Sequence, residues 1–119
     1  MAGFKPVPGT SMIWERNVLG SQVTRLHTDG AMLTIVQGAA GDVVPAHGYS
    51  KGCVTYVVAG AIEIDGTVLR SGDAGTYVAP GGYFAVKFLE DSVYVVARAA
   101  QDDITVPDIG ERAAHHLDA

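Results

Sequence analysis

The spacing of the glycines is the feature that most limits how this chain can fold. Fifteen glycines separate short runs rich in Val, Ile, Thr and Tyr, the residues that favour β-strands. No sustained 3.6-residue periodicity of apolar residues appears, which argues against βαβ units. Short, closely spaced strands indicate a sandwich or a closed barrel. The strands we expect are 22–27, 31–37, 42–46, 54–59, 61–65, 67–70, 75–79, 84–89 and 92–99.

Tight turns are expected where small polar residues and glycine meet. Asp-Gly and Ser-Gly pairs supply the positive φ that such turns need. They occur in Thr28-Asp29-Gly30, in Asp65-Gly66 and in Arg70-Ser71-Gly72-Asp73. Helix is expected only in residues 108–117, which follow Pro107.

Length and composition favour one globular domain spanning 1–119, with its core at about 20–100. The chain has 119 residues, 48% of them hydrophobic and 18% charged, enough apolar content to bury a core without disulfides. The formal net charge is −5, and the eight Lys and Arg residues are scattered singly. Nucleic acid is therefore not an expected partner.

The expected compartment is the cytoplasm. Residues 1–11 lack the apolar run of a signal sequence, and no later run approaches the roughly 20 apolar residues that span a bilayer. No membrane partner is therefore expected. Cys53 is the only cysteine, so an internal disulfide is impossible and a reducing compartment is compatible with the sequence.

Two stretches resemble the motifs of the cupin family. Residues 41–60 read GDVVPAHGYSKGCVTYVVAG, which is similar to the first motif, G-x5-H-x-H-x(3,4)-E-x6-G. Residues 72–85 read GDAGTYVAPGGYFA, which is similar to the start of the second, G-x(5-7)-P-x-G-x2-H-x3-N. The resemblance covers residues 24–98 and implies an all-β cupin-type double-stranded β-helix, a jelly-roll barrel. The lead-in at 14–26 also resembles that of diketone-cleaving cupins and of the cupin half of certain anti-sigma factors.

Most of the family's metal ligands are absent. In metal-binding cupins two His and a Glu from the first motif and a His from the second converge on one ion. The resemblance places His47 at the first His, Tyr49 at the second, Cys53 at the Glu and Ala85 at the last His. One imidazole cannot supply the three or four donors that hold a transition metal well. No cofactor is therefore expected, and a divalent metal held by His47 with atypical ligands is the alternative.

The family register implies that His47, Tyr49 and Cys53 all point into the barrel. These residues are the candidate catalytic groups, because an imidazole beside a thiol lowers the thiol's pKa and creates a reactive thiolate. The competing interpretation is that Cys53 packs as a small hydrophobic residue and that Tyr49 fills the barrel. Val57 and Phe88 are expected at the apolar base of the cavity.

Tyr83, Ala85 and Lys87 are the candidate substrate-binding residues. They share one face of a strand by the period of two, and the match of Ala85 to a family ligand makes that face the inner one. Lys87 is then an interior cation. A bulge near Gly81-Gly82 would instead turn Lys87 into water, where lysines usually lie.

These residues predict a barrel that binds a small organic molecule. Our first hypothesis is an enzyme that uses acid–base or thiol chemistry, an isomerase or a lyase, with His47 as the general acid or base. The alternatives are a binding or regulatory barrel without catalysis and a metal-dependent, dioxygenase-like enzyme. We also expect a homodimer, because cupins resembling this chain pair through their sheets and the chain has apolar surface to cover.

Overall fold

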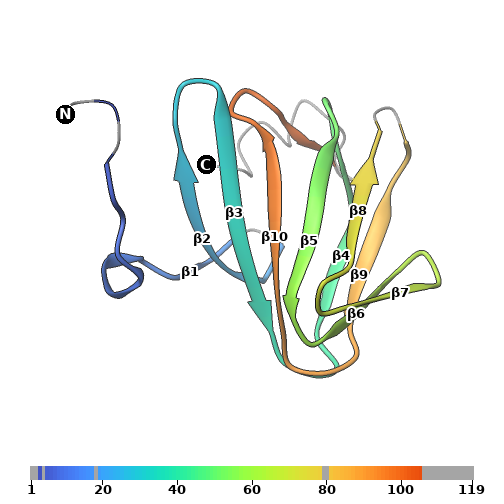
Figure 1. Ribbon diagram of the computed structural model, residues 1–119. Helices are drawn as coiled ribbons and strands as arrows, with labels where there is room; N and C mark the ends of the chain where they lie inside the picture. Colours follow the sequence, from blue (N-terminus) through green and yellow to red (C-terminus); the bar gives the residue numbers. More distant parts are fainter. Residues whose placement is uncertain (1–2, 4, 18, 79–80, 106–119) are drawn as a thin grey trace.

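Two antiparallel sheets face each other in the computed structural model, which describes residues 3, 5–17, 19–78 and 81–105 (Figure 1). The larger sheet has the order β1-β2-β3-β10-β5-β8 and the smaller one β11-β4-β9-β6-β7. Neighbouring strands are often far apart in sequence, as in a jelly roll. The strands are β1 (Glu15–Arg16), β2 (Gln22–His27), β3 (Ala31–Gly38), β4 (Val43–Tyr49), β5 (Cys53–Ala59), β6 (Ala61–Ile64), β7 (Thr67–Arg70), β8 (Ala74–Tyr77), β9 (Phe84–Phe88), β10 (Ser92–Ala99) and β11 (Ile104–Thr105).

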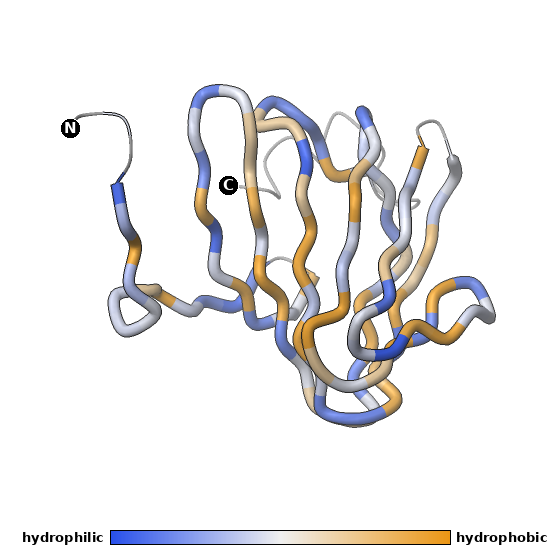
Figure 2. The backbone as a smooth tube through the Cα atoms, viewed as in Figure 1, coloured by the Kyte–Doolittle hydropathy of each residue, from blue (hydrophilic) through white to orange (hydrophobic). Residues whose placement is uncertain are grey.

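The expected all-β jelly roll is confirmed. Within the described residues the only helical element is a single 3-10 turn, Gly9–Ser11, and none of their helices is long and apolar enough to cross a membrane. β2, β7 and β10 have the bounds expected from the sequence. The helix expected at 108–117 lies outside the described residues. Figure 2 shows apolar residues along the strands and hydrophilic ones at the β2–β3 turn.

The core lies between the sheets because side chains alternate along each strand. β10 shows the alternation most clearly, since Tyr94 and Val96 are buried while Ala97 is exposed. Val57 and Phe88 belong to this core, as expected. The side chains with the least exposure are Val23, Val57, Ile62 and Val86.

β4 runs three residues beyond the end expected at Ala46. Its last residues pair with β11, where Tyr49 lies opposite Ile104 and Gly48 opposite Thr105. This partner is distant in sequence, and its two residues are too few to show a period. The alternation of apolar and polar residues in the sequence therefore predicted neither β11 nor β1, which also has only two residues.

A bulge in β4 brings two of its residues, three apart in sequence, to the same face of the strand. Val44 pairs with Val86 and His47 pairs with Phe84, so β4 carries one more residue than β9 between these pairs. The extra residue falls at Pro45-Ala46, where proline has no N–H to lose from the ladder. As a result Val44 and His47 both point inward, opposite the inward residues of β9, which are Phe84, Val86 and Phe88.

The expectation that Ala85 faces inward is therefore wrong. Ala85 and Lys87 alternate with the inward residues of β9, and Lys87 is exposed, opposite Val43 and Glu63. Tyr83 precedes the strand and is 46% exposed. The assignment failed because it rested on matching Ala85 to the last His of the family motif, whereas the core-facing residues of this strand are its neighbours Phe84 and Val86.

Gly60 provides a test of the β5–β6 corner. Its φ is +87°, and a Cβ there would lie 2.2 Å from the Ser92 hydroxyl oxygen and 2.4 Å from the Asp91 carbonyl oxygen. Gly66 has a φ of +80° but open space around it. Gly66→Ala should cost about 1–2 kcal/mol of unfolding free energy, and Gly60→Ala about 1–3 kcal/mol more. Equal losses for the two variants in urea unfolding would contradict the close packing at this corner.

Candidate functional site

His47 and Tyr49 lie side by side inside the barrel, two residues apart on β4. The Nδ1 atom of His47 is 2.8 Å from the Pro45 carbonyl oxygen, and its Nε2 atom is 3.3 Å from the Tyr49 hydroxyl oxygen. Because a carbonyl oxygen only accepts, Nδ1 carries the proton and donates it to Pro45. The lone pair of Nε2 then accepts a hydrogen bond from Tyr49, which fixes the tautomer of the neutral imidazole.

Burial keeps both of these groups neutral. Loss of water lowers the pKa of His47 below its ordinary value of 6.5, against the hydrogen bond to Pro45 and together with the charge of Arg98. Loss of water also raises the pKa of Tyr49. At neutral pH the pair is therefore an unprotonated Nε2 facing an undissociated phenol.

Aromatic rings surround the imidazole. The centroid of Phe84 is 4.7 Å from that of His47, and Tyr77 is 5.2 Å from Phe84. The Tyr77 hydroxyl donates to the Gly82 carbonyl oxygen at 2.6 Å, which ties this ring to the loop before β9. Sequence reasoning missed Phe84 because it assigned the adjacent Ala85 to the interior.

Cys53 lies in a different cavity from His47 and Tyr49. It is the first residue of β5, opposite Tyr77 on β8, and only 8% of it is exposed. It lines a cavity of about 310 Å³ between β8 and the β6–β7 hairpin, with Thr55, Leu69 and Phe84 among its neighbours. Burial raises the pKa of the thiol, partly offset by a hydrogen bond with Thr55. The shift is opposite to the one that thiol activation needs.

Arg98 is a buried cation that sequence reasoning did not single out. It follows Tyr94 and Val96 on the inner face of β10, is 8% exposed, and places its guanidinium carbon 5.1 Å from the centroid of the Tyr49 ring. Its Nη1 donates to the Asp102 carbonyl oxygen at 3.4 Å. The signal was weak because β10 is apolar on both faces, so its pattern does not reveal which residues are inside.

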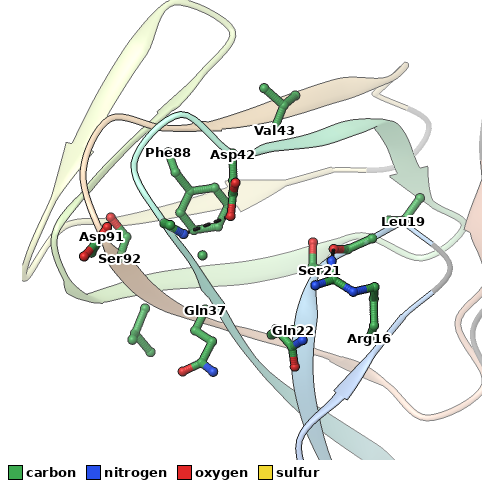
Figure 3. Close-up of a pocket in the computed structure, with 14 residues that line it drawn as sticks. Arg16, Leu19, Ser21, Gln22, Gln37, Asp42, Val43, Phe88, Asp91 and Ser92 are labelled. Carbon is green, nitrogen blue, oxygen red and sulfur yellow. Dashed lines mark hydrogen bonds between the residues drawn. The ribbon is translucent and has the colours of Figure 1, made fainter.

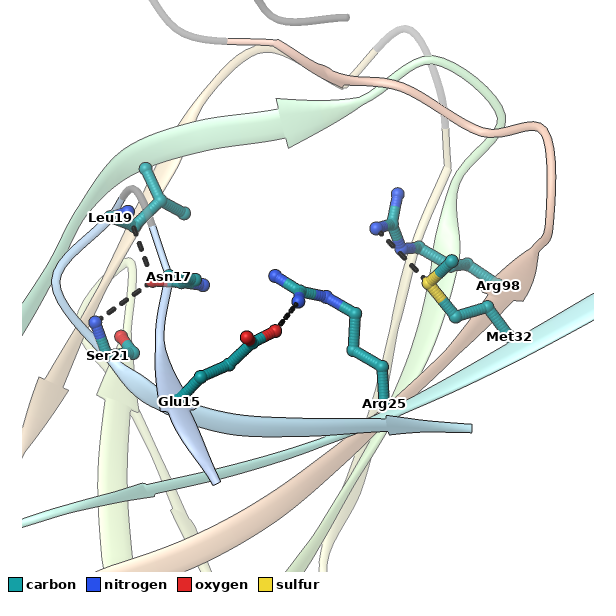
Figure 4. Close-up of polar contacts among 7 residues, drawn as sticks. All are labelled: Glu15, Asn17, Leu19, Ser21, Arg25, Met32 and Arg98. Carbon is teal, nitrogen blue, oxygen red and sulfur yellow. Dashed lines mark hydrogen bonds and ion pairs between the residues drawn. The ribbon is translucent and has the colours of Figure 1, made fainter. Parts of the chain in front are cut away.

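A second arginine lies at the same end of the barrel. Arg25, on β2, donates from Nη1 to the Glu15 carboxylate of β1 at 2.8 Å. Figure 4 shows the Glu15 carboxylate pointing toward Arg25, with Arg98 beside Met32 on the other side of the view.

The segment that carries Glu15 lines the same cavity as the two arginines. We call residues 15–17 and 19–21 the strap. The Asn17 side-chain oxygen accepts from the backbone N–H groups of Leu19 and Ser21, each at 3.0 Å, and Arg16 donates to the Gly20 carbonyl oxygen. These bonds lie within the strap, so it holds its own shape.

Beneath the strap lies a small internal cavity. Its volume is about 30 Å³, enough for about one water molecule. Side chains of the strap and the inner faces of both sheets enclose it: Asn17, Leu19, Ser21, Arg25, Thr34, Val36, Val44, His47, Tyr49, Tyr94, Val96, Arg98 and Ile104.

Asp102 shapes the turn after Tyr49. The carboxylate is 5% exposed, and its Oδ1 accepts from the Ser50 hydroxyl and the Lys51 N–H, both at 2.6 Å. Its Oδ2 is buried and has no hydrogen-bond partner among the described residues. This negative charge raises the pKa of Arg98, against the dominant effect of burial, which lowers it.

The donor set does not fit a metal ion held in the manner of the family. Nδ1 of His47 donates to Pro45, which leaves Nε2, now beside the Tyr49 hydroxyl, as the one ring nitrogen with a lone pair for an ion. Across residues 5–17, 19–78 and 81–105, no three His, Cys, Asp or Glu side chains gather into a group that could hold an ion. The ring of Phe84 lies beside the one imidazole instead.

A second, wider cleft is lined by Phe88 but by none of the candidate catalytic or substrate-binding residues. It has a volume of about 630 Å³ and lies between the strap, which contributes Arg16, Leu19 and Ser21, and the turns after β3 and β9 (Figure 3). The two carboxylates that line this cleft accept hydrogen bonds from backbone N–H groups: Asp42 from Ala39 and Asp91 from Ala40. We therefore place the candidate site at the His47 end.

Solved structures with the same fold include several cupins. An RmlC-like cupin from Shewanella frigidimarina matches with a TM-score of 0.67 and 20% identity, over 78% of this chain and 87% of that one. KdgF from Halomonas sp. gives 0.67 and 25%, over 79% and 91%. An acetylacetone dioxygenase from Acinetobacter johnsonii gives 0.70 and 13%, over 93% and 82%.

No protein-family model matches the chain, and none of the curated proteins does. The evidence for the fold is instead the pair of facing sheets and their similarity to the solved cupin structures. The chain is therefore a small domain of the cupin fold, as the two stretches that resemble the cupin motifs indicated.

Proposed function

We propose that the barrel binds a small organic molecule at the His47 end and that His47 and Tyr49 move protons on it without a tightly held metal. The observation that carries this proposal is the fixed tautomer of His47, with Nδ1–H on Pro45 and Nε2 facing the Tyr49 hydroxyl. A base and an acid are thereby held side by side in a water-poor interior.

Such a pair suits reactions that relocate a proton. Nε2 can accept a proton from one atom of a ligand, and the Tyr49 hydroxyl can donate one to another, which is the requirement of an isomerisation or a lyase step. Neither group has to change its charge before the ligand arrives, because burial keeps both neutral. The chemistry therefore rests on acid–base transfer.

Access requires the strap to move. The cavity under it holds about one water molecule, and Leu19 of the strap packs against the core. A ligand larger than water takes the space of Leu19 when the strap swings away. The present arrangement is the closed form of the site.

The other hypotheses have less support from the geometry. A thiol mechanism needs an acidic Cys53, whereas burial raises the pKa of its thiol, and His47 and Tyr49 line another cavity. Tyr83, Ala85 and Lys87 lie on or near the outer surface of β9, so any part in binding is played outside the barrel. A binding barrel without catalysis shares the same site and differs only in the absence of proton transfer.

Proton exchange tests the proposal. A thermal-shift screen of small acids, ketones and sugars should first identify a ligand, and the wild-type protein should then exchange an acidic C–H of that ligand in D2O, followed by NMR. His47→Gln should bind the ligand but slow the exchange by about 100-fold or more. His27→Gln, at an exposed histidine of β2, is the matched control. Exchange at the wild-type rate in His47→Gln would refute the role of His47.

We further propose that two copies of the chain pair through the outer face of the larger sheet. The strand register aligns two rows of residues across this face, none of them charged: Leu26, Leu33, Ala97 and Val54, and Ile35, Val95 and Tyr56. Val54 and Tyr56 are about half exposed. The chain has a net charge of −5, so two copies repel each other where their charged surfaces approach. The uncharged outer face of the larger sheet can instead pack against the same face of a second copy across a two-fold axis.

Light scattering tests the pairing. The wild-type protein should be a dimer at tens of micromolar, and Tyr56→Lys should convert it to a monomer by placing like charges at the interface. Val68→Lys, at an exposed apolar residue of the smaller sheet, should leave the dimer intact. A wild-type monomer would contradict the proposal, as would a dimer that Tyr56→Lys leaves unchanged.

A further inference from the structure

Three glycines lie inside the described strands, and close packing explains two of them. They are Gly38 in β3, Gly48 in β4 and Gly75 in β8. A Cβ at Gly38 would lie 2.8 Å from the ring of Phe88, and a Cβ at Gly48 would lie 2.7 Å from the Gly82 carbonyl oxygen. A side chain at either position would therefore displace a neighbour.

Gly75 has no such explanation. The nearest atom to a Cβ there is Cδ1 of Leu69 at 3.7 Å, an ordinary van der Waals distance, and the φ of Gly75 lies outside the left-handed region. The pairing of β8 with β5 is regular, with Gly75 opposite Thr55, so no bulge requires glycine. Glycine weakens a strand and otherwise marks a bend, a bulge or a site that another molecule approaches closely.

A side chain at Gly75 would project into the cavity of about 310 Å³ that Cys53 also lines. This cavity lies between β8 and the β6–β7 hairpin, and β7 and β8 are the end strands of the two sheets (Figure 1). Its volume is at the lower end of the roughly 300–1,000 Å³ of small-molecule sites.

Apolar surface that the core does not cover is concentrated in this cavity. The apolar side chains that pack against the core but are only partly buried are Leu19, Ile64, Leu69, Tyr77 and Phe84. All of these except Leu19 line the cavity. A bound apolar molecule would remove this surface from water, which is favourable.

Two aromatic rings form one wall of the cavity. The centroids of Tyr77 and Phe84 are 5.2 Å apart, and the ring planes are inclined by 48°. The Tyr77 hydroxyl donates to the Gly82 carbonyl oxygen and accepts from the Gly81 N–H, which fixes the orientation of its ring. Tyr77 and Gly75 are two residues apart on β8 and face the same side. A ligand ring over Gly75 can therefore pack beside both rings at the roughly 4.5–7 Å typical of aromatic pairs.

The charges around the cavity disfavour an anionic ligand. Among the described residues that line it, none is Lys, Arg or His, and the one carboxylate is that of Asp65, which is exposed at the β6–β7 turn. Burial raises the pKa of the Cys53 thiol, so this group is also neutral at neutral pH. A carboxylate entering the cavity would lose its water without gaining a cation.

We propose that this cavity binds a small uncharged aromatic molecule, with its ring over Gly75 and against Tyr77 and Phe84. Neither His47 nor Tyr49 lines the cavity. The inference therefore goes beyond the proposed function, and it holds or fails whether or not His47 moves protons.

An NMR titration of the 15N-labelled protein with three probes tests the inference. Benzamide and benzoate have nearly the same shape and differ in charge, whereas cyclohexanecarboxamide keeps the amide and lacks the aromatic ring. Benzamide should bind about tenfold or more tightly than benzoate and about threefold or more tightly than cyclohexanecarboxamide. Its largest shifts should fall on the amides of β8 and of Thr55. Equal binding of benzamide and benzoate, no binding of benzamide, or shifts confined to another part of the barrel would overturn the inference.

A variant that fills the cavity provides the second arm of this experiment. Gly75→Leu should weaken benzamide binding about tenfold or more, because the new side chain takes the place of the ligand ring. Gly30→Leu is the matched control, since a Cβ at Gly30 meets open space, and it should leave the affinity unchanged. Should Gly75→Leu fail to fold, Leu69→Trp, which fills the cavity from β7, decides by the same loss. Wild-type affinity in the folded variant would overturn the inference.

Thermal unfolding of the ligand-free protein separates a glycine kept for a ligand from one that the fold requires. Gly75→Ala should leave the midpoint of unfolding unchanged or raise it, because the backbone at Gly75 can accept a side chain. Gly60→Ala, at a position where a Cβ meets backbone, should lower the midpoint. A lower midpoint in Gly75→Ala would show that the fold itself needs this glycine and would overturn the inference.

Discussion

The extra residue in β4 at Pro45-Ala46 is the constraint on which the rest of the site depends. It sets His47 opposite Phe84 and frees the Pro45 carbonyl oxygen to accept the Nδ1 proton of His47. The hydrogen bond to Tyr49 follows from that tautomer. One irregularity in a ladder thus determines the orientation, the protonation and the neighbours of the imidazole.

Much of the fold was predictable from the sequence, because glycine turns and β-branched runs are local signals. The bounds of β2, β7 and β10 and the turn at Asp65-Gly66 came from such signals. The candidate site was predictable only in part. His47 and Tyr49 follow from a motif on one strand, whereas the pairing of His47 with Phe84 depends on a bulge in β4. The positions of Arg98 and of the strap depend on pairings between distant segments.

The interior combines features that a purely structural barrel would avoid. A neutral imidazole, a phenol and two arginines lie under a short strap. A two-residue strand, an exposed ion pair and the packing of Leu19 against the core hold the strap to the barrel. Burying such groups costs stability, since polar and charged side chains lose their water. Because the pKa of His47 is lowered in the folded protein, the unfolded chain binds a proton at this residue at a pH where the folded chain does not. The unfolding free energy contributed by His47 is therefore present above pH 6.5 and declines as the pH falls below that value.

The central claim is that His47 is neutral, with its proton on Nδ1. A pH titration of the imidazole nitrogens by 15N NMR measures this directly, because protonated and unprotonated ring nitrogens have different shifts. The account predicts a protonated Nδ1 and an unprotonated Nε2 at neutral pH, a pKa below 6.5, and loss of this signature on unfolding. A proton on Nε2, or an imidazole that becomes charged above pH 6.5, would contradict the account.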